Sequence, residues 1–588
     1  MLQYQIKLEH YRAHLFSVRM VIPAQSAPVR RLSLPAWIPG SYMIRDFARN
    51  LSKVRGFVEH AEIDITPLDK QTWQVAPYQG ELTIEYQVYA FDLSVRSAYL
   101  DGLFGFFNPS SLCLQVDADD LSPCEISLEL PSELAHWQIA TGMPQTSGAP
   151  WQGQTFVAQS YTELLEYPFI MGELSIVEFT VKDIPHALVF VGQHDADLDR
   201  IGRDVSEICR AQIDMFDGTV PFQRYLFLTM VVGDGFGGLE HINSTALLCS
   251  RRDLIWNEAA AVDKNYQRFL SLCSHEYFHS WNVKAVRPAE LTPYQLASEQ
   301  YTKQLWFYEG MTSYFDDYFV HHAGLIDAQQ YLNTLTDTIT RVERSQGVHQ
   351  QSVVESSFYA WTKFYQQDAN AANAIVSYYT KGALLALWLD LRLRATTQTS
   401  LPELFGQFWQ QHYHSQVMTS EDSFVHYLEQ RAGHQLATEF SRLVHGVGWV
   451  PLTEALAACG VELHMVTSSD DSDSAVGTAA TTQPVRLGAK YQANPGDIQL
   501  TVVYRGEAAE QAGLCPGDRI IAIDNLASTR TSLNDILIRK RPGQISRLHV
   551  FRRDELLELE LKWAPANPTL RKARVVDSAR AARWLRLS

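Results

Sequence analysis

Three features are missing from this sequence, and each absence excludes a class of protein. None of its seven cysteines forms a Cys-x-x-Cys pair, no run of 18 or more residues is apolar, and 49 basic residues face 66 acidic ones, for a formal charge of -17. An odd number of scattered cysteines is typical of reduced thiols, so we expect a cytoplasmic protein without a disulfide framework. The lack of a long apolar run argues against a membrane span. The acidic net charge argues against nucleic-acid binding as the main activity.

The length of 588 residues, with 46% hydrophobic residues, predicts several folded cores rather than one. Short alternating segments such as Tyr4–Leu8 indicate strands early in the chain, and helical periodicity dominates after Ala259. The N-terminus has no basic segment followed by an apolar stretch, so we expect no secretory signal. We predict an all-β domain (1–173), a central domain that becomes helical (174–466), a polar linker (467–483), a small β-rich domain (484–565) and a basic, helical tail (566–588).

The main candidate for a catalytic segment is His275-Glu276-Tyr277-Phe278-His279, which lies in a helical pattern. Residues four apart share a helical face, so His275 and His279 can bind one metal ion, and Glu276 can reach a water on that metal. Zinc is the expected ion because it accepts neutral imidazole and lowers the pKa of a coordinated water to about 7. The alternative is a pair of partly exposed histidines on a surface helix.

Glu309 is the candidate for the third protein ligand that a catalytic zinc requires. It follows the apolar stretch Leu305-Trp306-Phe307-Tyr308, 30 residues after His279. A carboxylate in such surroundings usually has a partner, because burying an unpaired charge is costly. The alternative is a glutamate on a helix surface beside Gly310.

Further motifs accompany this cluster in order along the chain. Trp281-Asn282-Val283-Lys284 and Arg287-Pro288 follow it, Gly237-Gly238-Leu239-Glu240-His241 precedes it, and Tyr378-Tyr379-Thr380-Lys381-Gly382 lies downstream. With them the sequence resembles the glycyl aminopeptidase family of zinc metallopeptidases, relatives of the thermolysin-like aminopeptidases. The resemblance implies an α+β multidomain protein with an N-terminal β-sandwich-like domain, a thermolysin-like catalytic domain and a C-terminal PDZ domain.

Gly237, Gly238 and Glu240 are the candidate substrate-binding residues. Glycines let a peptide backbone approach closely, and a strand edge can pair with an extended substrate. Glu240 supplies a negative charge for the free α-ammonium of the substrate, a role that the resemblance also implies. The alternative is a glutamate on a surface turn.

Tyr379 matches the tyrosine that, in similar enzymes, donates a hydrogen bond to the oxyanion of the tetrahedral intermediate. Such a donor acts on charge that develops only in the transition state. Tyr378 is the competing residue. Periodicity does not distinguish the two, and the register of the motif favours Tyr379.

The small domain resembles bacterial PDZ domains over Arg505–Leu514 and Pro516–Asp524. PDZ domains bind an extended peptide at a sheet edge and its terminal carboxylate in a loop. The candidate loop, Arg486–Ala489, matches the family pattern only loosely. A peptide ligand, a structural role and a lid over the catalytic cleft therefore all stay open.

Together these features predict a zinc aminopeptidase with one catalytic zinc ion, acting on peptides with a free N-terminus. The resemblance implies a preference for a small first residue, glycine or alanine. Two alternatives are a broad-specificity metallo-endopeptidase, which would have no use for Glu240, and a peptide-binding PDZ scaffold with a vestigial metal site. The scaffold predicts the loss of at least one catalytic residue, yet all the expected ones are present.

Overall fold

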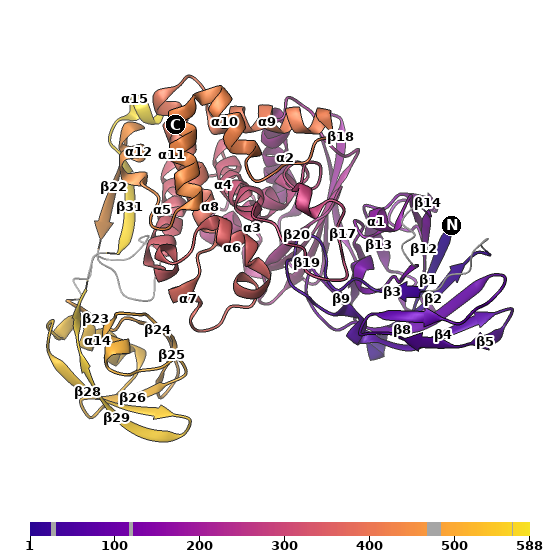
Figure 1. Cartoon of the computed structure of the whole chain (residues 1–588), viewed down its shortest axis with the longest axis horizontal. Helices are drawn as coiled ribbons and strands as arrows, with labels where there is room; N and C mark the ends of the chain where they lie inside the picture. The colour runs from indigo at the N-terminus through magenta and orange to yellow at the C-terminus, as the bar shows by residue number, and fades with distance from the viewer. Residues whose placement is uncertain (25–30, 117–121, 467–483, 567–568, 588) are drawn as a thin grey trace. The chain divides into compact units, whose positions relative to one another are not determined.

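Figure 1 shows the computed structural model of the chain, which describes residues 1–24, 31–116, 122–466, 484–566 and 569–587. Its contacts divide the chain into two compact units. The first comprises Met1–Tyr301 with Trp409–Thr419, and the second Thr302–Phe408 with Ser420–Ser588. The predicted linker, 467–483, lies outside the described residues.

The N-terminal region is built from strands, as the alternating pattern predicts. Every second residue from Leu2 to Leu8 is buried, so one face of this strand packs on the core and the other does not. Tyr4, Leu32 and Phe106, each from a different sheet, belong to one hydrophobic core. A short helix, α1 (Tyr161–Leu164), follows the strands β14 (Gln145–Ser147) and β15 (Thr155–Ala158). The β-rich N-terminal region predicted from the sequence is confirmed.

Three sheets of this region occur within the described residues. The first has the order β14 (Gln145–Ser147), β15 (Thr155–Ala158), β12 (Cys124–Glu129), β1 (Leu2–His10), β2 (Leu15–Ile22), β8 (Leu82–Tyr89), β4 (Leu51–Val58) and β5 (Ala61–Ile63). The second has β13 (Gln138–Thr141), β16 (Phe169–Gly172), β10 (Phe104–Phe107) and β9 (Ala98–Leu100), and the third β11 (Gln115–Val116), β3 (Arg31–Ser33), β7 (Thr72–Val75) and β6 (Ile65–Pro67).

The first unit also contains a five-stranded sheet that positions the candidate site. Its order is β17 (Ser175–Val181), β18 (Ile184–Val191), β19 (Tyr225–Val232), β21 (Ser244–Ser250) and β20 (Gly237–Glu240). The central strands are parallel, and β19 is apolar except for one threonine because such strands are covered on both faces. Helix α2 (Leu198–Met215) connects β18 to β19, and α3 (Lys264–Phe278) follows β21. Strand β20 runs antiparallel to β21 at one edge.

Helices follow this sheet along the chain, as the change of periodicity predicts. They are α4 (Leu305–His322), α5 (Ala328–Arg344), α6 (Val353–Phe358), α7 (Ala371–Ala374), α8 (Tyr378–Thr396), α9 (Leu401–Ser415), α10 (Ser423–Ala432), α11 (His434–His445) and α12 (Leu452–Ala458). Helices α4 and α8 meet at two glycines: a Cβ on Gly310 would lie 2.6 Å from the Cα of Gly382. Only residues without side chains allow two helix backbones to approach this closely.

The small C-terminal region is a sheet with two helices. Its strands have the order β24 (Ala489–Ala493), β25 (Ile498–Val503), β26 (Arg519–Ile523), β28 (Ile545–Arg552) and β29 (Glu555–Lys562), with β27 (Leu526–Ala527) beside β26, and β23 (Val485–Arg486) pairs with β30 (Ala564–Pro565). The helices are α13 (Ala508–Gln511) and α14 (Arg530–Arg539). The sequence of short helix, turn and strand expected from 505–524 is therefore present, and the assignment as a PDZ domain stays a prediction.

The predicted helical tail, 566–588, is wrong in its main element. Residues Leu570–Val575 form strand β31, which pairs antiparallel with β22 (Val461–Val466), and only the short α15 (Ser578–Ala581) is helical. Leu570 and Ala573 are buried, and the ladder to β22 satisfies the backbone groups of the segment. Pairing with a partner about a hundred residues away outweighs the local helix preference of a Lys- and Arg-rich segment.

All seven cysteines are free thiols, and six of them are buried, as expected for a chain without a disulfide framework. Within the described ranges, no helix is both long and apolar enough to cross a bilayer.

Candidate active site

Helix α3 brings His275 and His279 together on one face. Asp263 caps the start of the helix, since its side chain accepts a hydrogen bond from the backbone N–H of Tyr266. The two imidazole rings have centroids 4.7 Å apart. Nδ1 of His279 lies 2.9 Å from the carbonyl oxygen of Asn282, so Nδ1 carries the proton and donates it, and Nε2 is then the ring nitrogen that can bind a metal.

Glu309 and Tyr379 are brought near each other by the contact between α4 and α8. Each of them lies close in sequence to one of the two glycines, Gly310 and Gly382, at which these helices meet. Burial, and then the negative charge of Glu309, raise the pKa of Tyr379 well above its ordinary value. The Glu309 carboxylate is thus part of the electrostatic environment of the Tyr379 hydroxyl.

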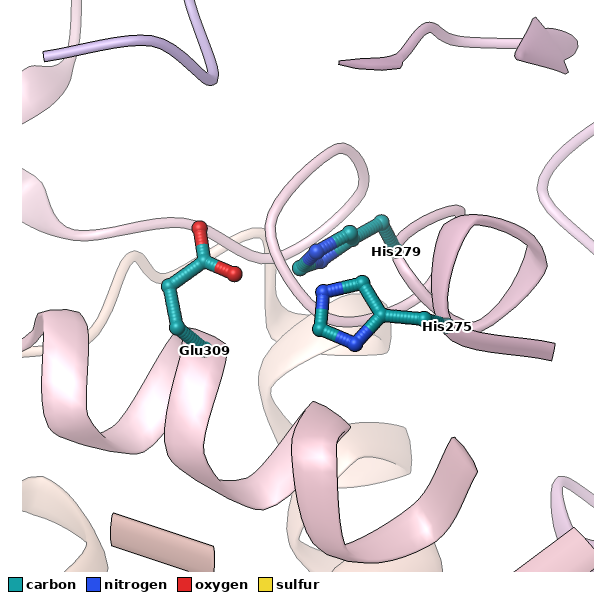
Figure 2. Close-up of side chains that lie close together, drawn as sticks. All are labelled: His275, His279 and Glu309. Atoms are coloured by element: carbon teal, nitrogen blue, oxygen red, sulfur yellow. The ribbon is translucent and has the colours of Figure 1, made fainter. Parts of the chain in front are cut away.

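His275, His279 and Glu309 form a group that fits a metal ion. One ligand atom from each lies within 4.8 Å of the others. Figure 2 shows the carboxylate of Glu309 directed toward the two rings. Two imidazole nitrogens and one carboxylate oxygen are a donor set of catalytic zinc sites, which keep a further position open for water or substrate.

A second group shares one member with the first. Ligand atoms of Glu240, Glu276 and His279, all three buried, also lie within 4.8 Å of one another. Glu276 follows His275 on α3, and its carboxylate lies so close to β20 that a side chain at Gly238 would overlap it. The edge strand, the glutamate of the His-Glu-x-x-His motif and one imidazole therefore meet at a single place in the first unit.

A turn of the N-terminal β region lies against Glu240. Ser41 N–H donates to the Ile38 carbonyl oxygen at 3.1 Å, and Gly40 has φ of 90°, as in a type II turn with Pro39 and Gly40 in its centre. A Cβ on Gly40 would lie 2.6 Å from Oε2 of Glu240. No sequence pattern indicates that this turn contacts Glu240.

The same N-terminal segment is anchored to a loop that follows α3. The indole N–H of Trp37 donates to the carbonyl oxygens of Gln295 and Ser298, at 3.0 and 2.9 Å, and the backbone N–H of Ala36 donates to Leu296 at 2.7 Å. Trp37 is fully buried. These hydrogen bonds fix the position of the turn that contacts Glu240.

A buried ion pair lies near Glu240. Nζ of Lys284 is 2.8 Å from a carboxylate oxygen of Glu166, and both side chains are almost completely buried. Burial alone would lower the pKa of Lys284, but nearby charges, those of Glu166 and Glu240 among them, outweigh it and raise the pKa. Burial, and then the Lys284 charge, lower the pKa of the buried His241 well below its ordinary value. Sequence reasoning missed this ion pair because its partners are more than a hundred residues apart.

Two sequence families and several solved structures match this chain. The profile of the Peptidase M61 N-terminal domain matches residues 3–173, and that of the M61 glycyl aminopeptidase matches residues 268–385, a range that contains His275, His279, Glu309 and Tyr379. The crystal structure of an aminopeptidase N family protein from Idiomarina loihiensis matches with a TM-score of 0.97 and 46% identity, covering 100% of both chains.

Two other solved structures are much less similar. An M1 zinc metallopeptidase from Deinococcus radiodurans has a TM-score of 0.47 and 13% identity, over 77% of this chain and 94% of that one. Aminopeptidase A from Legionella pneumophila, in complex with aspartic acid, has a TM-score of 0.49 and 13% identity, over 80% and 50%. Similarity this weak carries no inference about activity. No curated protein sequence matches the chain.

Proposed function

The chain belongs to the M61 glycyl aminopeptidase family, and from this premise we propose that it is a zinc-dependent aminopeptidase that removes single residues from the free N-terminus of peptides. A preference for glycine or alanine as the first residue is part of the proposal and rests on the family. The single zinc ion would be held by His275, His279 and Glu309, whose ligand atoms lie within 4.8 Å of one another.

The observation that carries the proposal is the group formed by Glu240, Glu276 and His279. If Glu240 binds the α-ammonium, its distance from the other two fixes which peptide bond is cleaved. The α-nitrogen and the first carbonyl carbon of a peptide are about 2.5 Å apart, and each further residue adds about 3.5 Å. Atoms within 4.8 Å of one another leave room for the first peptide bond and not for the second. This spacing supports an exopeptidase over an endopeptidase.

Each residue then has one task. Zinc, when bound, supplies Lewis-acid polarisation of the scissile carbonyl and lowers the pKa of a water. Glu276 takes the proton of the attacking water and delivers it to the leaving amine. Glu240 holds the substrate ammonium, and the Tyr379 hydroxyl donates a hydrogen bond to the oxyanion. Gly237 and Gly238 let the substrate backbone approach the edge strand.

Residues 484–565 are proposed to be a PDZ domain, a reading supported by the order of α13, turn and β26. Strand β24 lies at an edge of its sheet, where an added peptide would pair. A cytoplasmic location is supported by the seven free thiols.

Metal analysis and a substrate panel test the proposed function. The purified protein is expected to contain about one zinc ion per chain, as a three-ligand catalytic site requires. It should release glycine and alanine from aminoacyl chromogenic amides and from peptides, and should lose this activity when a chelator removes the metal. Efficient cleavage of N-acetylated peptides would instead identify an endopeptidase, and a metal-free protein would favour the PDZ scaffold.

Glu240→Gln is expected to lower kcat/KM for substrates with a free amino group by about 10- to 100-fold. The substitution keeps the size of the side chain and removes the charge that pairs with the ammonium, an interaction of the strength of a charged hydrogen bond. Steady-state kinetics on glycine p-nitroanilide measure the effect. Any trace cleavage of the N-acetylated substrate should be unchanged in the variant. A variant as active as the wild type on substrates with a free amino group would contradict the proposal that Glu240 binds the ammonium.

Gly40→Ala is expected to lower kcat/KM on the same substrate by about tenfold. The added methyl group would displace the Glu240 carboxylate, and the left-handed backbone adds about 1–2 kcal/mol of strain. Gly80→Ala is the matched control, because Gly80 has φ of 97° and its Cβ would meet only Val58 at 3.9 Å. The control should lose comparable thermal stability and keep full activity. Equal losses of activity in both variants would mean that the turn acts only through folding.

A further inference from the structure

Arg96, between strands β8 and β9 of the N-terminal β region, reaches the edge strand of the five-stranded sheet. Its Nη2 donates to the carbonyl oxygen of Gly238 at 3.2 Å, and its Nη1 lies 3.6 Å from where a Cβ on Gly237 would be. The backbone N–H of Arg96 donates to the hydroxyl of Ser94 at 3.2 Å, which fixes the base of the side chain. The guanidinium therefore lies alongside the two glycines proposed to border the substrate.

Most donors of this guanidinium are not used by the described residues. Among the described residues Arg96 forms no ion pair, and its Nε is buried without a hydrogen-bond partner. Within the described part of the chain, only one guanidinium nitrogen, Nη2, donates to the protein, at the Gly238 carbonyl oxygen. A guanidinium has five N–H donors in a planar fork that matches the two oxygens of a carboxylate. Arg96 thus keeps donors for an anionic group beside β20.

The position of Gly238 in strand β20 gives the distance between the Arg96 guanidinium and Glu240. This step rests on the proposed function, in which Glu240 holds the substrate ammonium. Gly238 lies two residues before Glu240, about 7 Å along an extended strand, and packs against Glu276. An extended dipeptide spans about the same length from its α-nitrogen to its carboxylate. The carboxylate of a dipeptide anchored at Glu240 therefore falls at the level of Arg96.

We propose that Arg96 binds the C-terminal carboxylate of dipeptide substrates and so makes the enzyme prefer dipeptides with a free carboxyl group. The carboxylate enters a region that already holds the negative charges of Glu240 and Glu276, both buried. Without a cation it would be repelled there. The hydrogen bond to Gly238 orients the plane of the guanidinium, so its N–H donors have a fixed direction before the substrate binds.

The test compares glycyl-alanine with glycyl-alanine amide, which differ only in the terminal carboxylate. Arg96→Gln is expected to lower kcat/KM for the free dipeptide by about 10- to 100-fold, mainly through KM, because a charge-assisted hydrogen-bond pair is lost. For the amide the change should stay below about threefold. Arg96→Lys, which keeps the charge, should recover part of the loss. Arg19→Gln removes an exposed arginine of strand β2 and should leave both substrates unaffected.

The outcomes separate this proposal from the proposed function. Suppose that the wild type releases glycine, and that Arg96→Gln either loses the same activity on both substrates or loses none on either. The carboxylate role of Arg96 is then overturned, and the aminopeptidase activity stands. If the wild type releases no glycine from either substrate or from glycine p-nitroanilide, both proposals fail. A second measurement detects binding without turnover, because it uses the Glu276→Gln variant. Calorimetry gives the Kd of glycyl-alanine for this variant alone and with Arg96→Gln added. The second substitution should raise the Kd by about the same 10- to 100-fold.

Discussion

Glu276→Gln is expected to lower kcat by about three to four orders of magnitude while the protein keeps its zinc. General acid–base catalysis contributes up to about 10⁴-fold, and a glutamine of the same shape cannot accept the proton of the attacking water. The variant should still fold, because the amide fits the same space against Gly238. Steady-state kinetics on glycine p-nitroanilide and metal analysis of the same preparation measure the two quantities.

Glu309→Gln is the control for that experiment. Glu309 belongs to the group with His275 and His279, whereas Glu276 does not, so the control should lose metal and activity together. Glu276→Gln should lose activity alone. An active Glu276→Gln enzyme would refute the mechanism, and loss of metal from both variants would place Glu276 among the ligands.

Tyr379→Phe is expected to lower kcat by about 100- to 1000-fold with little change in KM. Removing one donor to an oxyanion costs this much because the hydrogen bond forms fully only in the transition state. The substitution keeps the ring, which stacks on Phe364 with centroids 5.5 Å apart, so the start of α8 should be undisturbed. Kinetics on the same chromogenic substrate, with zinc content unchanged, measure the effect.

Tyr378→Phe is the matched control, since it removes the same hydroxyl from the adjacent residue. Tyr378 is completely buried, and its ring packs on Phe364 at a centroid distance of 4.7 Å. We expect less than about a fivefold change in kcat, as for a substitution outside the reacting groups. The reverse order of the two effects would make Tyr378 the oxyanion donor, the alternative that periodicity leaves open.

The part of the site that the sequence predicts is the part built from local contacts. His275 and His279 approach each other because they are four residues apart on one helix, and helix geometry is the same in every protein. Glu309 lies 30 residues further on, and aromatic neighbours alone indicate its burial. Its approach to Tyr379 depends on the contact of two helices at Gly310 and Gly382, which no local pattern contains.

The remaining residues belong to contacts across long stretches of chain. Gly40 and Arg96 lie in the N-terminal β region, and they reach Glu240 and Gly238 about 200 and 140 residues later. No local pattern in the sequence marks either residue. The helix predicted after residue 566 is wrong for the same reason, because the pairing of β31 with β22 is also long-range.

The anchoring of Trp37 limits how parts of this protein can be exchanged with those of relatives. Its indole and the adjacent backbone donate three hydrogen bonds to the loop 295–298. A chimaera that replaces only residues 1–173 would set a foreign tryptophan segment against this loop, and each buried donor left unpaired costs about 1–3 kcal/mol. Grafts that carry the loop together with the N-terminal strands should keep the Pro39–Gly40 turn in place. An exchange should therefore include residues 295–298 and should not stop at residue 173.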